Sequence, residues 1–222
     1  MKISAETISV LKNFSAINQS IIFKEGNVIK TISPQKTVMA SATVADEFPR
    51  EAGIYNLGQL LATLSMYKEP ELEFNDKTLT VSEGKSSSVI SYSDPSMIIS
   101  PPAKEIKLPG VDVSVNVTAG VISNVMKATG VLGLPEIAFV GEGGTCYLRA
   151  IDSANPSANS HSVEVGKTYD TFTLIIKTEN LNIIPGDYNV ELSSKGISKF
   201  SGDLATYFIA IESKSTYAKG VE

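Results

Sequence analysis

The chain has 222 residues, of which 42% are hydrophobic and 19% charged, and its formal net charge is −5. This hydrophobic content is enough for a buried core and excludes a charge-rich disordered chain. One Cys and one His exclude a disulfide framework and the common multi-cysteine zinc sites, and they argue against a histidine-based catalytic triad. The negative balance argues against a tight, sequence-reading DNA-binding protein, which would usually be basic.

The first part of the chain predicts a helix followed by strands. Ser4 is suited to cap a helix over residues 4–18, because its hydroxyl can accept an unpaired backbone N–H. The apolar face of this helix comprises Thr7, Ile8, Val10, Leu11, Phe14 and Ile17. Residues 21–24 and 28–32 flank a short polar turn, a pattern that predicts a hairpin. We expect a third strand over residues 37–44.

A second helix and three short strands complete the predicted first domain. Residues 56–67 predict the helix, and its apolar positions are Leu57, Leu60, Leu61 and Leu64. The expected strands cover residues 71–74, 78–82 and 88–92. The following stretch, residues 100–110, contains Pro101, Pro102 and Pro109, and proline disfavours both helices and central strands. We therefore interpret residues 104–112 as a connector between domains at residues 1–103 and 113–222.

The second half repeats the order of elements in the first. A helix is expected over residues 118–130, followed by a hairpin of residues 136–140 and 145–151. Residues 171–176 predict a strand, residues 178–184 a short second helix, and residues 188–211 three further strands. The repeat lies in the order of elements, and it indicates an internal duplication of about 100 residues per copy. The expected fold class is α+β, with two similar domains.

No catalytic, metal or cofactor site can be defended from the sequence. His161 lies in a polar stretch that we interpret as a solvated loop, and Cys146 lies mid-strand without a basic neighbour, as expected for a structural thiol. The glycine-rich residues 141–144 lack the Lys–Ser/Thr of a phosphate-binding loop and predict a hairpin turn. No Asp-x-Asp calcium loop is present. No apolar run approaches the ~20 residues of a membrane helix, so we expect no membrane partner.

Positive charge gathers at the predicted helices although the whole chain is acidic. The helices and their flanks contain Lys2, Lys12, Lys68, Lys127 and Lys177, against only Glu6 and Glu179. Lys12 and Lys127 each lie on a polar face otherwise made of small residues. Such a face suits close approach to a phosphate backbone without base reading. The alternative interpretation is an ordinary solvated helix face.

Two segments resemble the DNA polymerase processivity factor, or sliding clamp, of T-even-type bacteriophages. The N-terminal segment MKISAETISVLKNFSAIN is similar to that family's opening helix. The segment IPGDYNVELSSKGISKFSGDLATYFIAIESKST, which begins at Ile184, is similar to its closing strands. The helix predicted over residues 56–67 and the proline-bearing connector also follow in the order that the family has. The resemblance covers essentially the full chain.

The resemblance implies a ring of three identical subunits with two clamp domains each, sheets outside and helices lining the hole. It implies a protein that is not an enzyme and needs no cofactor. Such a ring encircles duplex DNA and tethers the phage replicative polymerase, with the clamp loader as a further partner. A link to late transcription and a location in the cytoplasm of the infected bacterial host also follow from it.

The resemblance also implies positions for the functional residues. Lys12 and Lys127 match the family's inner-helix cations, Lys2 is a weaker match, and Lys177 is a further DNA-facing candidate. A groove for partner peptides would be lined by Ile106, Leu108 and Tyr217. An alternative for the first two is that they pin the connector to the sheet.

Ring closure implies that subunits pair through exposed edge strands. Residues 78–82 and 195–200 are the candidate edges. Two other interpretations of the whole chain are a structural or scaffold homo-oligomer of the phage particle, and a small-molecule enzyme.

Overall fold

The computed structural model describes residues 1–102, 104 and 106–220, and the chain forms two compact units, Met1–Glu105 and Ile106–Glu222. The division falls within the proline-bearing segment that the sequence marks as a connector. Residues 103 and 105 of this segment, and the last two residues of the chain, lie outside the described residues. The exact bounds of the domains and of the connector stay a prediction.

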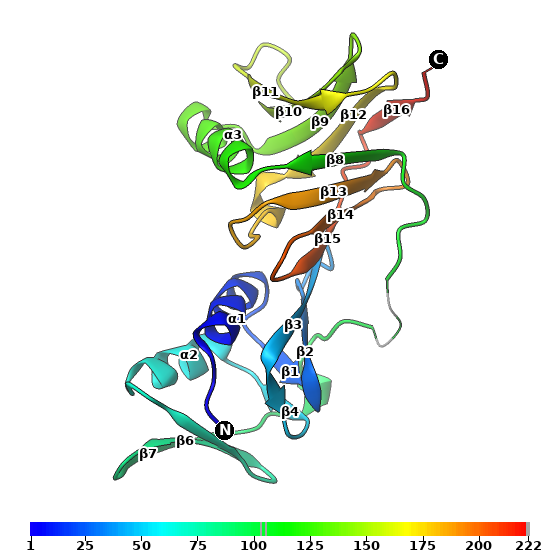
Figure 1. The fold of residues 1–222 in the computed structure, drawn as a ribbon. Coiled ribbons are helices and arrows are strands. Elements are labelled where there is room, and N and C mark those ends of the chain that lie inside the picture. The colour runs from blue at the N-terminus through cyan, green and yellow to red at the C-terminus, as the bar shows by residue number, and fades with distance from the viewer. Residues whose placement is uncertain (103, 105, 221–222) are drawn as a thin grey trace. The chain divides into compact units, whose positions relative to one another are not determined.

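Unit 1 contains two helices, α1 (Ala5–Ile17) and α2 (Leu57–Ser65), among its described residues (Figure 1). Both helices begin where the sequence predicts, because the side chains of Ser4 and Asn56 accept backbone N–H groups of the first turns. The apolar face of α1 is buried at Thr7, Val10, Leu11, Phe14 and Ile17. Beneath the helices, Phe23 and Phe48 stack with ring centroids 4.5 Å apart, and Phe74 meets both edge-on.

The strands of unit 1 are β1 (Ile21–Phe23), β2 (Gly26–Ile32), β3 (Val38–Phe48), β4 (Ala52–Ile54), β5 (Glu71–Phe74), β6 (Thr78–Glu83) and β7 (Ser86–Ser91). The hairpin predicted from residues 21–24 and 28–32 is wrong, because β1 pairs with β4 and β2 pairs with β3. Gly26 adopts φ +104°, and the β2–β3 register shifts just after it. The short turn therefore connects β1 to β2 without pairing them, and each strand pairs with another partner.

Unit 2 has one α-helix among its described residues, α3 (Ala119–Leu132). Thr118 caps its start, and Gly133 ends it in the left-handed conformation with φ 65°. Val125 and Thr129 are buried, whereas Gly120, Ser123, Asn124 and Lys127 are exposed. The predicted polar face of the helix is thus confirmed.

The strands of unit 2 are β8 (Val113–Val117), β9 (Glu136–Glu142), β10 (Thr145–Ile151), β11 (His161–Lys167), β12 (Thr171–Lys177), β13 (Tyr188–Ser193), β14 (Ile197–Ser201), β15 (Thr206–Ala210) and β16 (Thr216–Ala218). One sheet has the order β11-β10-β9-β12-β16, and β15, β14, β13 and β8 pair in sequence in another. The β9–β10 hairpin is confirmed, with Gly143 and Gly144 both at positive φ in its turn.

Two further predictions for unit 2 are wrong. Residues 178–184 form only a short 3-10 turn at Thr178–Asn180, which has no side-chain cap and is followed by irregular chain up to Pro185. Proline disfavours the helical conformation of the residue before it, so a helix in this segment would have to end before Ile184. His161 is not in a loop but begins β11, where it pairs with Ala150. The residues next to His161 in the sequence are polar, and polar residues do not by themselves predict a strand.

Candidate nucleic-acid interface

Helix α1 carries Lys12, and the first turn of this helix is held by Asp46, a carboxylate on β3. Asp46 Oδ2 accepts hydrogen bonds from the Ser4 backbone N–H at 2.8 Å, from Ser4 Oγ at 2.7 Å and from Thr7 Oγ1 at 2.5 Å. Burial raises the pKa of Asp46, but the hydrogen bonds from Thr7 and Ser4 outweigh burial and lower it overall. Lys12 is exposed, on the face of α1 opposite its buried apolar residues.

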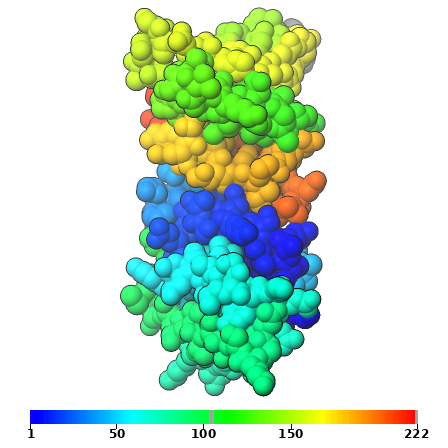
Figure 2. Space-filling view, turned by 90° about the vertical axis from the view of Figure 1, so that its left-hand side faces the viewer, coloured from blue at the N-terminus to red at the C-terminus, as the bar shows by residue number. Residues whose placement is uncertain are grey.

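Helix α3 presents Lys127 in the same manner. Thr118 Oγ1 accepts the Val121 N–H at 3.4 Å, and Asp187 Oδ1 accepts the Ala119 N–H at 2.8 Å. A carboxylate from outside the helix therefore fixes the start of both α1 and α3. The sequence of α3 contains Lys127 and no acidic residue. On unit 1, Figure 2 shows the surface of α1 in dark blue and that of α2 in cyan.

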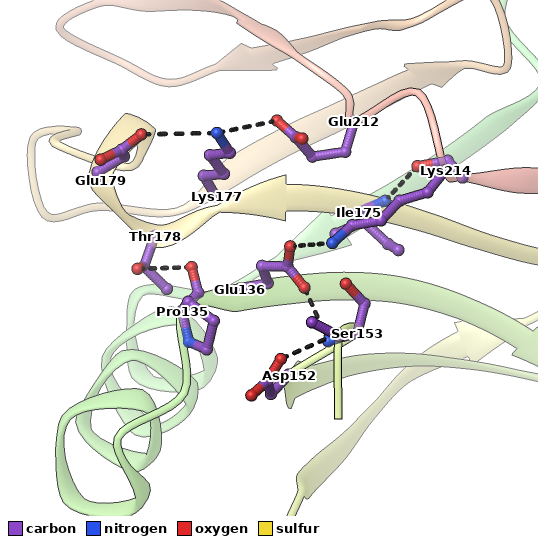
Figure 3. Close-up of polar contacts among 12 residues, drawn as sticks. Pro135, Glu136, Asp152, Ser153, Ile175, Lys177, Thr178, Glu179, Glu212 and Lys214 are labelled. Carbon is purple, nitrogen blue, oxygen red and sulfur yellow. Dashed lines mark hydrogen bonds and ion pairs between the residues drawn. The ribbon is translucent and has the colours of Figure 1, made fainter. Parts of the chain in front are cut away.

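Lys2 and Lys177, the other two predicted DNA-facing residues, lie beside carboxylates. Lys2 Nζ is 2.7 Å from Glu69 Oε2, and the hydrogen bond that Lys2 donates to this carboxylate raises the pKa of the lysine. Lys177 ends β12, and its Nζ lies 4.0 Å from a carboxylate oxygen of both Glu179 and Glu212 (Figure 3). The helix over residues 178–184, which Lys177 was expected to flank, does not form. Among the described residues, no carboxylate pairs with Lys12 or Lys127.

The predicted peptide groove involves the connector and the C-terminal strand. Ile106, Leu108 and Tyr217 are each half-buried. The Tyr217 hydroxyl donates to Asp170 Oδ2 at 2.7 Å, and its ring stacks on Phe172 at 6.1 Å between centroids.

Two acidic residues define the surroundings of Tyr217. The hydrogen bond to Asp170 raises the pKa of Tyr217 to about 12, and the negative charge of Asp112 contributes to the rise. The contacts that hold Tyr217 itself come from Asp170 and Phe172.

Both candidate edge strands are wrong. β6, which covers residues 78–82, is the central strand of the sheet β5-β6-β7, and β14, within residues 195–200, lies between β13 and β15. Sequence alone could not show this, since an edge is defined by pairing between distant segments. β5 is covered by the N-terminus through a bridge between Lys2 and Glu71. Among the described strands, the sheet edges of six residues or more are β2, β7 and β11.

Exposed apolar side chains lie on or near β7 and β11. In unit 1, Val89 on β7 is 64% exposed and Met66 at the end of α2 is 73% exposed. The end of α2 is tied to β7, because Tyr67 Oη and Ser88 Oγ are 2.8 Å apart. In unit 2, α3 packs against β11, and Val131 in its last turn is 84% exposed. Each unit therefore combines a free strand edge with an apolar helix end.

The described residues offer no feature of a catalytic or metal site. Cys146 is buried, and burial raises the pKa of its thiol to about 11, so the thiol stays protonated and is a poor nucleophile at neutral pH. The described part of the chain brings no three His, Cys, Asp or Glu side chains together as a metal site. Among the same residues, no helix is long and apolar enough to cross a membrane.

Comparison with known proteins identifies the family. Residues 4–100 match the family model "DNA polymerase processivity factor", and residues 114–213 match "gp45 sliding clamp, C terminal". The sliding clamp of Vibrio phage KVP40 is 33% identical over 96% of this chain and 99% of its own length. The sliding clamp of Enterobacteria phage T4 is 28% identical over 98% of this chain and 99% of its own length.

Solved structures agree on the fold. The PCNA chain of a structure described as the C-terminal region of FEN-1 bound to A. fulgidus PCNA superposes with a TM-score of 0.71 at 14% identity, covering 97% of this chain and 98% of that one. A putative DNA polymerase III beta subunit from Eubacterium rectale gives a TM-score of 0.68 at 13% identity, over 94% of this chain and 63% of that one. The predicted α+β clamp fold is confirmed. The chain therefore belongs to the family of phage DNA polymerase processivity factors, the sliding clamps, which are non-catalytic.

Proposed function

We propose that three copies of the chain close into a ring around duplex DNA, with α1 and α3 turned toward the DNA. The observation that carries this proposal is that Lys12 and Lys127 are exposed and pair with no carboxylate among the described residues. The two helices contain a single acidic residue, Glu6, in a chain whose net charge is −5. Acidic outer surfaces would repel DNA and direct it to the lysine-bearing helices. The ring would tether the phage polymerase at the primer end by raising its effective concentration there.

Contact with DNA would be weak and independent of sequence. Lys12 and Lys127 in three copies supply about six phosphate contacts at most, and Lys is a mobile point charge rather than a bidentate fork. Partial occupancy of such contacts allows sliding, since retention depends on topology and not on affinity. Lys2 and Lys177 would contribute less, because neighbouring carboxylates already neutralise part of their charge.

The subunit contact would join β7 of one copy to β11 of the next. Both strands carry unpaired backbone groups that favour addition of a further strand. The apolar helix ends, with Met66 on one surface and Val131 on the other, would pack beside the joined strands and be removed from water. Three such contacts in head-to-tail order would close the ring.

Two substitutions that each place a charge on an apolar position test the subunit contact. Val89→Asp or Val131→Asp should convert the trimer, at three times the 23.7 kDa of the chain, to monomers in native mass measurements. Val28→Asp serves as the control, because Val28 is 44% exposed and lies on β2, which takes no part in the proposed β7–β11 contact. A trimer that survives both changes contradicts the β7–β11 contact.

The DNA-facing assignment needs a separate test. Lys12→Glu combined with Lys127→Glu should impair clamp loading and processive synthesis while the trimer stays intact. Lys24→Glu combined with Lys195→Glu is the matched control, since it makes the same charge change at exposed turns, one in each unit. Equal loading by the two double variants would refute the assignment.

Polymerase and clamp loader would each dock a short peptide at the connector and tail, in the cytoplasm of the infected host. Ile106, Leu108 and Tyr217 would supply apolar contacts to that peptide. Tyr217→Ala should weaken polymerase binding in a pull-down on loaded clamps, whereas Tyr55→Ala, at an exposed tyrosine of unit 1, should not. Equal polymerase binding by both variants would remove Tyr217 from the groove.

A further inference from the structure

His161 lies on the same side of the sheet as α3. In the β10–β11 register, His161 is opposite Ala150, and Val163 is opposite Leu148. Leu148 lines a small apolar cavity together with Val125 and Met126 of α3, and Ala150, two residues further along β10, is buried on the same face. Because paired residues point to the same face of a sheet, the His161 side chain is on the helix side, at the outer edge of the sheet.

The imidazole of His161 contacts the exposed surface of α3. His161 Nε2 is 2.6 Å from Asn124 Oδ1, and Asn124 lies one helical turn before Lys127 on the exposed face. An amide oxygen accepts hydrogen bonds, so Nε2 carries the proton and Nδ1 is the nitrogen free to take up a second one. Protonation would thus add a positive charge beside Lys127 without breaking the bond to Asn124.

The groups around His161 leave that added charge available. On α3 the charged residue is Lys127, and β8, which packs against β11, has no titratable residue. On β10, Tyr147 and Arg149 are on the opposite face, where Arg149 pairs with Glu142, and Cys146 is buried.

The acids nearest in sequence are also engaged elsewhere. On β11 itself, Glu164 pairs with Lys167. In the loop before β11, Asp152 Oδ1 accepts the Ala154 N–H at 2.9 Å. Among the described residues, no carboxylate therefore pairs with His161.

We propose that His161 is a further DNA-facing residue of the clamp, and that its imidazolium form contacts a backbone phosphate next to Lys127. The inference rests on the proposed placement of α3 against DNA. Histidine ordinarily gains its charge within the range of about pH 8 to pH 5, so the clamp would grip DNA more strongly as the pH falls. One added charge per subunit gives a trimer up to about three more phosphate contacts.

The test measures one-dimensional diffusion of loaded, fluorescent clamps on DNA at about pH 6 and pH 8, the range over which histidine changes charge. The original clamp should diffuse at least about twofold more slowly at the lower pH, and added salt should remove the difference. His161→Gln, which can still bond Asn124, should lose the pH dependence. His161→Lys should be slow at both pH values.

The outcomes separate this inference from the proposed function. If Lys127→Glu speeds diffusion while His161→Gln keeps the original pH dependence, His161 does not contact DNA and this inference alone is overturned. If neither change alters diffusion, the placement of α3 against DNA is overturned as well. If His161→Gln loses the pH dependence and Lys127→Glu diffuses faster than the original clamp at both pH values, the role of His161 and the placement of α3 against DNA are both supported.

Discussion

Replacing Asp46 with alanine should destabilise unit 1 by removing the anchor of α1. The side chain accepts three hydrogen bonds at the helix start, from the Ser4 N–H, Ser4 Oγ and Thr7 Oγ1. Thr7 is fully buried, so its hydroxyl would lose this charged acceptor inside the protein. Hydrogen bonds to charged groups contribute about 1.5–3 kcal/mol each, but they are not additive and Asp46 is partly exposed. We expect a loss of about 2–4 kcal/mol in the free energy of unfolding.

Urea unfolding of the full chain, followed by circular dichroism, measures this loss. With an m-value of about 2 kcal/mol/M, the midpoint of the unit 1 transition should fall by about 1–2 M. Asp46→Asn is the matched control, because it keeps an acceptor oxygen and removes the charge, and it should lose roughly half as much. A midpoint for Asp46→Ala within about 0.2 M of the original would refute the reasoning.

The same carboxylate predicts the direction of a pH effect. The pKa of Asp46 is lowered in the folded chain, so its stabilisation is fully present above the ordinary aspartate pKa of about 3.9. It is lost as the pH falls through the lowered, folded-state pKa. The gap in stability between the original chain and Asp46→Ala should therefore be constant near neutral pH and shrink below about pH 4. A gap that widens in acid would contradict the direction of the shift.

Two further substitutions test the packing of unit 2. Gly141→Ala should lower the melting temperature, because a Cβ there would lie 2.5 Å from both the Asp170 carbonyl oxygen and the Phe172 ring; an unchanged melting temperature would contradict this contact. Glu136 is buried, with Lys214 Nζ at 2.6 Å and the Ser153 N–H donating to it at 2.9 Å. Lys214→Met should cost about 3 kcal/mol, because the buried carboxylate would lose its positively charged partner, whereas the double variant with Glu136→Gln should recover part of that loss. Additive losses in urea unfolding would show that the pair is not coupled.

The helices were predictable because their signals are local. Ser4 and Thr118 cap α1 and α3 from the positions that the sequence indicates, and the spacing of apolar residues identifies the buried faces. Lys12 and Lys127 could be placed on exposed faces for the same reason. Prediction failed at residues 178–184, where the absence of a cap and the approach of Pro185 decided against a helix.

Strand partners and edges were not predictable, because they depend on segments far apart in the chain. β1 pairs with β4 across residues 24–51, and nothing in the intervening turn indicates that choice. The roles of Asp46 and Asp187 at the helix starts were missed for the same reason. His161 was missed as a strand residue because its neighbours are polar, and its contact with Asn124 spans 37 positions.

The central claim is that the ring is held on DNA by topology, and circular and linear templates test it most directly. Clamps would be placed on nicked circular DNA with loader and ATP, and the circle would then be cut once by a restriction enzyme. We predict that clamps persist on the intact circle and run off the cut DNA within the time needed to diffuse to an end. Equal lifetimes on the two templates would mean that affinity holds the protein on DNA, which would contradict the account.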